Sequence, residues 1–399
     1  MSSIKREKIV NAFIDNRERI ANYLFYLALT VELVLMIVEK SDISFAYESY
    51  VFRATFLLTF LSVIIQKHDK KEWLIIVSFL AFTFLCYFLS GKNDLLRVAV
   101  FVMAAKNIDL NKTMKYCFYV SAAGFLIIAL LSLTGVMGEV VRIDDYGRDI
   151  VDEARYVFGF GHPNSLFSAG YVLFLMWLWI YGRNCSWLYY IPIAGLLAVL
   201  VNLTKSRTGM AIAAMTFVLA IFFKLFKKLE NFKFPYILET IVSPIFCVVI
   251  SVFAAGLTEY QYTGKGIFTM DVRYWNIEEK INYRMSNLYY SAENHGGILG
   301  NWKLFASHGA ESYFDMGWVR LFYWYGIIPT AVIILLILLI NYICYKKKDI
   351  WTPIIFFSLS VYTILEATFV TQYIGRNFFL IIAGVYIGQL ICGKLDSRF

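Results

Sequence analysis

Polar residues that could perform chemistry are concentrated in two stretches of an otherwise apolar chain. Residues 142–164 carry three arginines and five acids, and end in a Gly-His-Pro-Asn turn that contains His162. Residues 257–317 carry Arg284, His308 and Asp315. Arginine presents a planar fork that fits phosphate or carboxylate, and a carboxylate or histidine can accept a proton from a hydroxyl group. The two stretches therefore indicate an anion-binding site with an acid–base group.

The five acids of the first stretch have two interpretations. Clustered carboxylates bind divalent cations, but the spacing here matches no calcium-binding loop. Pairing with the neighbouring arginines is the better interpretation, and no metal site is predicted. The five acids are Asp144, Asp145, Asp149, Asp152 and Glu153.

The composition places the chain among membrane proteins. Of its 399 residues 59% are hydrophobic and 17% charged, whereas ordinary soluble domains are about half apolar and a quarter charged. A membrane-spanning helix needs roughly 20 apolar residues. We expect an all-α, polytopic protein that forms a single membrane domain over 1–399, with about twelve spans: 21–38, 48–66, 73–90, 94–106, 114–137, 165–182, 186–203, 208–226, 235–257, 317–343, 351–370 and 377–393. The fourth span is short and carries Arg97.

Lysine clusters predict the orientation, because basic residues near span ends are retained in the cytoplasm. The basic N-terminus has no signal-peptide layout, so both termini are expected to be cytoplasmic in a plasma-membrane protein. Every lysine cluster then falls on the inner side, where His68 is interpreted as a solvated loop residue. The outer side receives the first external loop (138–164) and a large second external loop (257–317). The many aromatic residues of the second loop argue against disorder.

Arginines dominate the outer face. Arg155 lies in the first loop and Arg284 in the second, while Arg207, Arg320 and Arg376 lie at the mouths of spans. Each could instead snorkel or form a salt bridge, but unpaired burial at a span mouth is unfavourable. His162 has two compatible interpretations, as a local cap of the next helix or as a base near the membrane surface. The excess of positive charge does not imply nucleic acid.

Several short patterns resemble one family. Arg284 is followed after fifteen residues by Gly300, and Asp315-Met316 is followed after nine residues by Gly326-Ile-Ile-Pro329. The first pattern is similar to the arginine-x15-glycine motif of Wzy-type polysaccharide polymerases, and the second to a motif of the related O-antigen ligases. Gly161-His162-Pro163-Asn164 and Ser206-Arg207-Thr208-Gly209 also look like polymerase segments. Asp315 stands where the ligases carry a catalytic histidine.

The resemblance implies an inverting, metal-independent glycosyltransferase without a cofactor, whose active site faces outward. Its substrates would be a glycan donor and acceptor linked to undecaprenyl diphosphate within membrane lipid, with a chain-length regulator as a further partner in capsule or O-antigen synthesis. Arg284, Arg207, Arg320 and Arg155 would bind the diphosphate. Asp315 would be the leading catalytic base, followed by His162 and His308. The alternatives are a polysaccharide ligase and a flippase or transporter of lipid-linked oligosaccharides.

Overall fold

The computed structural model describes residues 3–146, 152–268 and 273–393, and it is built almost entirely of helices. One two-stranded antiparallel hairpin pairs β1 with β2, with Arg142 opposite Arg155. The element bounds are α1 (Ser3–Lys40), α2 (Glu48–Ile65), α3 (Lys70–Ser90), α4 (Asp94–Ala104), α5 (Leu110–Leu133), β1 (Val141–Asp144), β2 (Glu153–Tyr156), α6 (Pro163–Trp177), α7 (Tyr190–Thr204), α8 (Arg207–Leu225), α9 (Phe234–Thr240), α10 (Cys247–Thr263), α11 (Arg273–Lys280), α12 (Arg284–Tyr290), α13 (Gly317–Tyr325), α14 (Ile327–Lys347), α15 (Trp351–Leu365) and α16 (Phe379–Ile391).

The helices support the multi-pass membrane prediction in its coarser form. Within the described residues, nine helical segments are long and apolar enough to cross a bilayer. Two shorter apolar helices, α15 and α16, follow them, and α4 has only 11 residues. The predicted count of about twelve spans is therefore not confirmed, while the all-helical membrane class agrees with the observed architecture.

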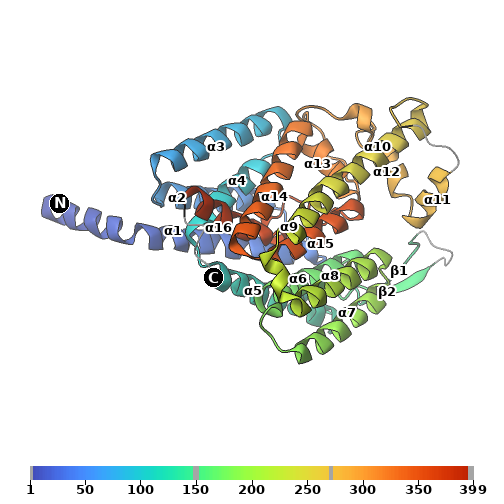
Figure 1. Ribbon diagram of the computed structural model, residues 1–399, viewed down its shortest axis with the longest axis horizontal. Helices are drawn as coiled ribbons and strands as arrows, with labels where there is room; N and C mark the ends of the chain where they lie inside the picture. The colour runs from blue at the N-terminus through green and yellow to red at the C-terminus, as the bar shows by residue number, and fades with distance from the viewer. Residues whose placement is uncertain (1–2, 147–151, 269–272, 394–399) are drawn as a thin grey trace.

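The two predicted external loops lie at the same end of the molecule. In Figure 1 the β1–β2 hairpin and α11 lie at the right, and the N-terminal end of α1 projects at the left. Along α1, Glu18 contacts the turn that follows α2, and Glu39 pairs with Arg376 after α15. At 1.5 Å per residue these two acids are about 30 Å apart, which matches the hydrocarbon thickness of a bilayer. We call the loop-bearing end the outer end and the other the inner end.

The second loop is more ordered than its polar composition suggests. The helix before it continues to Thr263, and the loop itself contains α11 and α12. A small separate apolar core packs these helices against α10 and α13, with Leu288 and Phe314 fully buried. The second loop is therefore ordered over the described residues, as its many aromatic residues predicted.

The prediction of one continuous helix over 317–343 is wrong. Gly326 separates α13 from α14 with φ +99°, and a Cβ there would lie 2.6 Å from the backbone of Phe305. The second loop returns at this break, where Ile327 N–H donates to the carbonyl of Lys303 over 2.9 Å. Only glycine permits both the left-handed backbone and the close approach.

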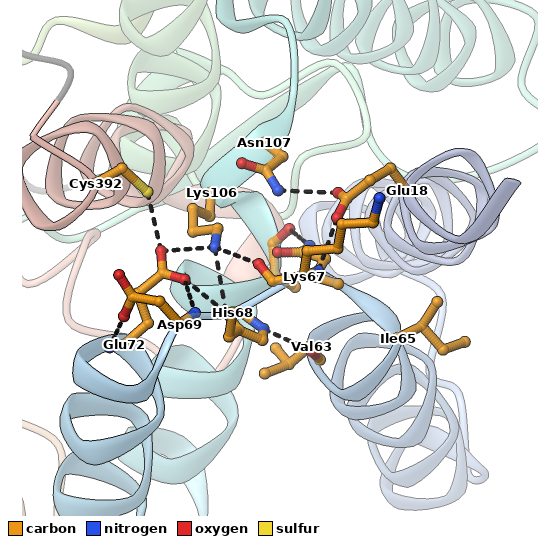
Figure 2. A network of polar contacts seen from close by, with 12 residues as sticks. Glu18, Val63, Ile65, Lys67, His68, Asp69, Glu72, Lys106, Asn107 and Cys392 are labelled. Carbon is orange, nitrogen blue, oxygen red and sulfur yellow. Dashed lines mark hydrogen bonds and ion pairs between the residues drawn. The ribbon is translucent and has the colours of Figure 1, made fainter. Parts of the chain in front are cut away.

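His68 is also not the solvated residue that the sequence suggested. Its side chain is only 1% exposed. Figure 2 shows it within a polar network at the inner end, where Lys106 Nζ lies 3.2 Å from His68 Nδ1 and donates to Glu72 over 2.8 Å. The Sγ of Cys392 in the last turn donates to the same carboxylate oxygen of Glu72 over 2.9 Å. This network joins α3, the turn after α4 and the end of α16.

The fourth predicted span carries Arg97, and the positive charge of this residue is neutralised inside the bundle. Its Nη2 lies 3.0 Å from Glu32 of α1, and both side chains are almost completely buried. Thr55 donates a further hydrogen bond to Glu32, and Nη1 of Arg97 donates to the carbonyl of Gln372. A buried ion pair of this kind holds α1, α2 and α4 in register because either charge alone would be unpaired.

Replacing Arg97 by methionine should lower the free energy of unfolding by about 3–5 kcal/mol, because the carboxylate of Glu32 stays buried without its partner. The double variant Arg97→Met, Glu32→Gln should recover most of that loss. Thermal unfolding of the detergent-solubilised protein measures both. Lys112→Met, which removes an exposed pair with Asp109, is the control and should change little; a double variant as unstable as the single one would contradict the pairing.

Candidate functional site

Arg284 is the centre of the outer polar site. It is the first residue of α12, and its guanidinium is largely buried. Nη2 lies 2.5 Å from Oε1 of Glu366, Nη1 donates to the carbonyl of Leu365, and Nε lies 3.8 Å from Oδ2 of Asp315. The Asp315 side chain is 41% exposed, whereas that of Glu366 is 9% exposed. One arginine therefore joins a buried carboxylate to an accessible one.

The structure around α12 fixes this arginine in place. Glu278 of α11 is fully buried and accepts hydrogen bonds from the backbone N–H and the hydroxyl of Ser286. That carboxylate satisfies a free N–H group in the first turn of α12. Gly300, the partner of Arg284 in the fifteen-residue spacing, donates from its N–H to Glu259 over 3.0 Å. A Cβ at Gly300 would lie 2.3 Å from that carboxylate, so a larger residue would displace the Glu259 side chain.

The first loop reaches the same cluster through the start of α6. Asn164 Nδ2 donates to Oε1 of Glu366 over 3.2 Å. Asn282, two residues before Arg284, donates to the carbonyl of Tyr146 over 3.3 Å. Segments from both external loops and from the end of α15 therefore meet. We call Asn164, Arg284, Asp315 and Glu366 the outer polar cluster.

His162 lies beside this cluster as the N-cap of α6. Its Nδ1 accepts a hydrogen bond from the backbone N–H of Asn164 over 3.1 Å. The residue remains open to solvent. Partial desolvation, and then the positive charge of Arg142, lower the pKa of His162, while the charge of Asp315 acts in the opposite direction. A neutral imidazole that accepts at Nδ1 carries its proton on Nε2. Nε2 of His162 is therefore a hydrogen-bond donor.

Arg155 is engaged by its own hairpin. Its Nε and Nη2 lie 2.9 and 2.5 Å from Oε2 of Glu153, and its guanidinium covers the ring of Tyr146. Lys205 lies 3.3 Å from the other oxygen of Glu153, and Arg142 forms a more exposed pair with Asp144. The predicted pairing of acids with arginines is confirmed for Asp144 and Glu153, and Asp149 falls outside the described residues.

Arg207 and Arg320 differ sharply from each other. Arg207 is exposed at the start of α8 and forms no hydrogen bond or ion pair with the described residues. Gly209 in the same turn contacts Phe167 of α6, which brings Arg207 to the outer end near the start of α6. Arg320 is 1% exposed, and it donates to the carbonyls of Phe314 over 2.9 Å and Val370 over 3.0 Å. Its guanidinium therefore fixes the backbone beside Asp315.

His308 contacts a different part of the outer end. Its Nε2 lies 3.3 Å from the carbonyl of Phe88, at the end of α3, and its ring lies against Gly91. No hydrogen bond or ion pair between described residues joins His308 to the outer polar cluster. His295, in contrast, is stacked on Tyr289 in a turn and bonded to that residue's carbonyl.

Glu366 is the residue of this site that the sequence did not single out. Burial raises its pKa, and the charge of Arg284 opposes that shift. The predicted span 351–370 placed Glu366 inside an apolar run, whereas α15 ends one residue earlier. A lone acid near the end of an apolar run is itself a signal for a functional or paired charge, and Glu366 carried that signal.

An apolar cavity of about 330 Å³ lies in the membrane region below this end. It is lined by α3, α4, α13, α14, α15 and α16. Trp318, Thr363 and Val370 line it toward the outer end, and His68, Glu72 and Lys106 line it toward the inner end. Thr363 lies one helical turn before Glu366, so the cavity begins close to the outer polar cluster.

Within the described residues, no three His, Cys, Asp or Glu side chains are arranged to hold a metal ion. The fold and the cluster together define a helical membrane protein with a charged site at one end and an apolar cavity beneath it. Comparison with known proteins finds no matching family model, curated protein or solved structure.

The lowered pKa of His162 makes a pH prediction. The unfolded histidine has a pKa near 6.5, so as the pH falls below about 6.5 the unfolded chain takes up a proton before the folded protein does, and stability decreases. His162→Asn retains an N-cap acceptor that does not titrate. Thermal unfolding between about pH 5 and 8 should therefore show a weaker acid destabilisation in His162→Asn. Identical pH profiles for the variant and the wild type would show that His162 does not titrate in this range. The wild type is the reference because His68, which also has a lowered pKa, is present in both proteins.

Proposed function

We propose that this chain is a lipid-linked polysaccharide polymerase. It would transfer a growing glycan from undecaprenyl diphosphate to a sugar hydroxyl of the next lipid-linked unit, on the outer face of the plasma membrane. The observation that carries the proposal is the meeting of Arg284, Asp315 and Asn164, from three segments distant in sequence, beside His162 and above an apolar cavity.

Charge supports the assignment of a diphosphate leaving group. When the anomeric carbon is attacked, its bond to the diphosphate oxygen breaks and negative charge develops on that oxygen. Preorganised cationic donors stabilise such charge. Arg207 is exposed and has no partner among the described residues, and Arg142 is 45% exposed. Arg207 is therefore open to an anion, while Arg142 would have to share its guanidinium with Asp144, and Arg284 with Glu366.

The proton of the acceptor hydroxyl must also be removed. Asp315 is the accessible carboxylate of the cluster, so in this proposal the hydroxyl oxygen forms the new glycosidic bond while its proton passes to Asp315. His162 presents an N–H donor at Nε2 and would orient a sugar or diphosphate oxygen. Arg320 and Arg155 are bonded within the protein, so we assign them positioning roles.

The apolar cavity supports a lipid-linked substrate over a water-soluble one. A polyprenyl chain needs an apolar surface next to the site that holds its diphosphate. The cavity is lined mainly by aliphatic and aromatic side chains and begins near Thr363 and Val370 at the outer end. A ligase would use the same geometry, so the product distinguishes these two functions.

Asp315→Asn should reduce polymer formation by about 10²–10⁴-fold, the usual contribution of a general base. Arg284→Lys should also reduce it, because lysine cannot hold Glu366 and the Leu365 carbonyl together in the geometry of a fork. A strain lacking the protein is complemented with each variant, and its lipid-linked glycans are resolved by length on a gel. The expected result is accumulation of single repeat units.

Arg183→Lys is the matched control, since Arg183 follows α6 at the inner end and pairs with Glu230 over 2.8 Å. It should leave the glycan lengths unchanged. Long polymer that persists on the lipid carrier in the deletion strain would reject polymerisation and favour the ligase. Single units retained on the cytoplasmic face would favour the flippase.

A further inference from the structure

A second polar site lies within the membrane region, far in sequence from the outer loops. Glu239 of α9 and Asn341 of α14 are buried, and Ser243 between α9 and α10 is completely buried. The carboxyl of Glu239 faces Ser243 and Asn341. Yet both carboxyl oxygens and the Oδ1 of Asn341 lack a well-formed hydrogen bond to the described residues. Three buried oxygens without a well-formed hydrogen bond are therefore gathered in one place.

The helix between α9 and α10 is broken at this point. Ser243 has non-helical angles (φ −129°, ψ 114°) inside a π-helical stretch, Ile241–Phe246. Pro244 has no N–H, so the carbonyl of Thr240 cannot receive the i+4 bond of an α-helix, and the stretch follows the i+5 pattern of a π-helix instead. The carbonyl of Ser243 receives a long contact, 3.5 Å, from Nδ2 of Asn341. The break thus places the backbone carbonyl of Ser243 beside the three side-chain oxygens.

The charge and the atom types of these groups indicate which kind of ion the site would bind. A buried carboxylate without well-formed hydrogen bonds or a counter-charge is strongly unfavourable in a bilayer. Carboxylate, amide and backbone oxygens are the ligands of hard cations, and unwound helix segments in membranes coordinate Na⁺ in this way. A single carboxylate balances one positive charge. The groups that influence the Glu239 carboxyl are Ser243 and Asn341, so among the described residues no second carboxylate is found for a divalent ion.

We propose that Glu239, Asn341 and the backbone break at Ser243 form a binding site for one Na⁺ ion. Glu239 lies five residues after the start of α9, about 8 Å along the helix, so the ion would enter from the inner surface. The hydroxyl of Ser243 is bonded to Ser360 and to the carbonyl of Phe356 in α15. The bound ion would therefore join α9, α10, α14 and α15.

The site has a route to the outer end through α10. Thr258, near the outer end of that helix, donates to the carbonyl of Met285, the residue after Arg284. An ion that fixes the break between α9 and α10 would fix the direction of α10 and with it the position of α12. This inference does not depend on the proposed polymerase activity, because binding of Na⁺ is measured without substrate.

The test uses the purified full-length protein in a neutral detergent at about pH 8, because a higher pH favours the ionised carboxylate over the protonated acid. Thermal unfolding is compared in NaCl, KCl and choline chloride at equal ionic strength. We expect the Tm of the wild type to be about 2 °C or more higher in NaCl than in choline chloride, with saturation as NaCl rises. Equilibrium binding of radioactive Na⁺ to the wild type should saturate near one ion per chain.

Glu239→Gln should lose both the Na⁺-dependent shift and the bound ion, and Glu239→Asp should retain a shift that needs more Na⁺. Glu230→Gln is the control, because it removes an acid near the same helix but outside the site, and it should behave as the wild type. Equal Tm values in all three salts, together with no saturable Na⁺ binding by the wild type, would overturn the proposal and leave Glu239 as a protonated carboxylic acid. The wild-type measurements decide the question even if Glu239→Gln does not fold.

Discussion

The neutralisation of ionisable side chains is the constraint on which most of this structure depends. A charge inside a bilayer must find an opposite charge or several hydrogen bonds. Arg97 meets Glu32 inside the bundle, and Arg284 meets Glu366 at the outer end. In each case the partners come from segments distant in sequence, so the same contacts that neutralise a charge also select the tertiary arrangement. Apolar packing alone would not specify it, because lipid tails are as apolar as the helix surfaces.

The outer end is organised differently from the bundle. Helices α11 and α12 are too short to be stable alone, and they hold their place because they share a small apolar core with α10 and α13. Glu278 completes this unit by bonding the start of α12. A rigid platform of this kind can hold charged side chains at fixed positions without membrane support. It also explains how a segment with many polar residues remains ordered.

The sequence was sufficient to predict the helical membrane class, both outer loops and the residues Arg284, Asp315 and His162 that come together there. It was insufficient where a side chain's role depends on tertiary partners. Glu366 was placed inside a predicted span because hydrophobic periodicity does not mark where a buried helix ends. Arg320 was expected to face a ligand, but its donors are occupied by backbone carbonyls. The break at Gly326 requires knowledge of which loop approaches it, and that information is not local.

The position of Arg320 affects how genetic data on this protein are interpreted. Its guanidinium connects the carbonyl of Phe314, next to Asp315, to that of Val370 after α15. A random-mutagenesis screen that scores loss of function would recover Arg320 together with residues that touch a substrate, since losing this connection displaces the segment that carries Asp315. Charge-swapped suppressors would not be recovered for Arg320, because an acidic side chain in its place cannot donate to the peptide carbonyls that it bonds.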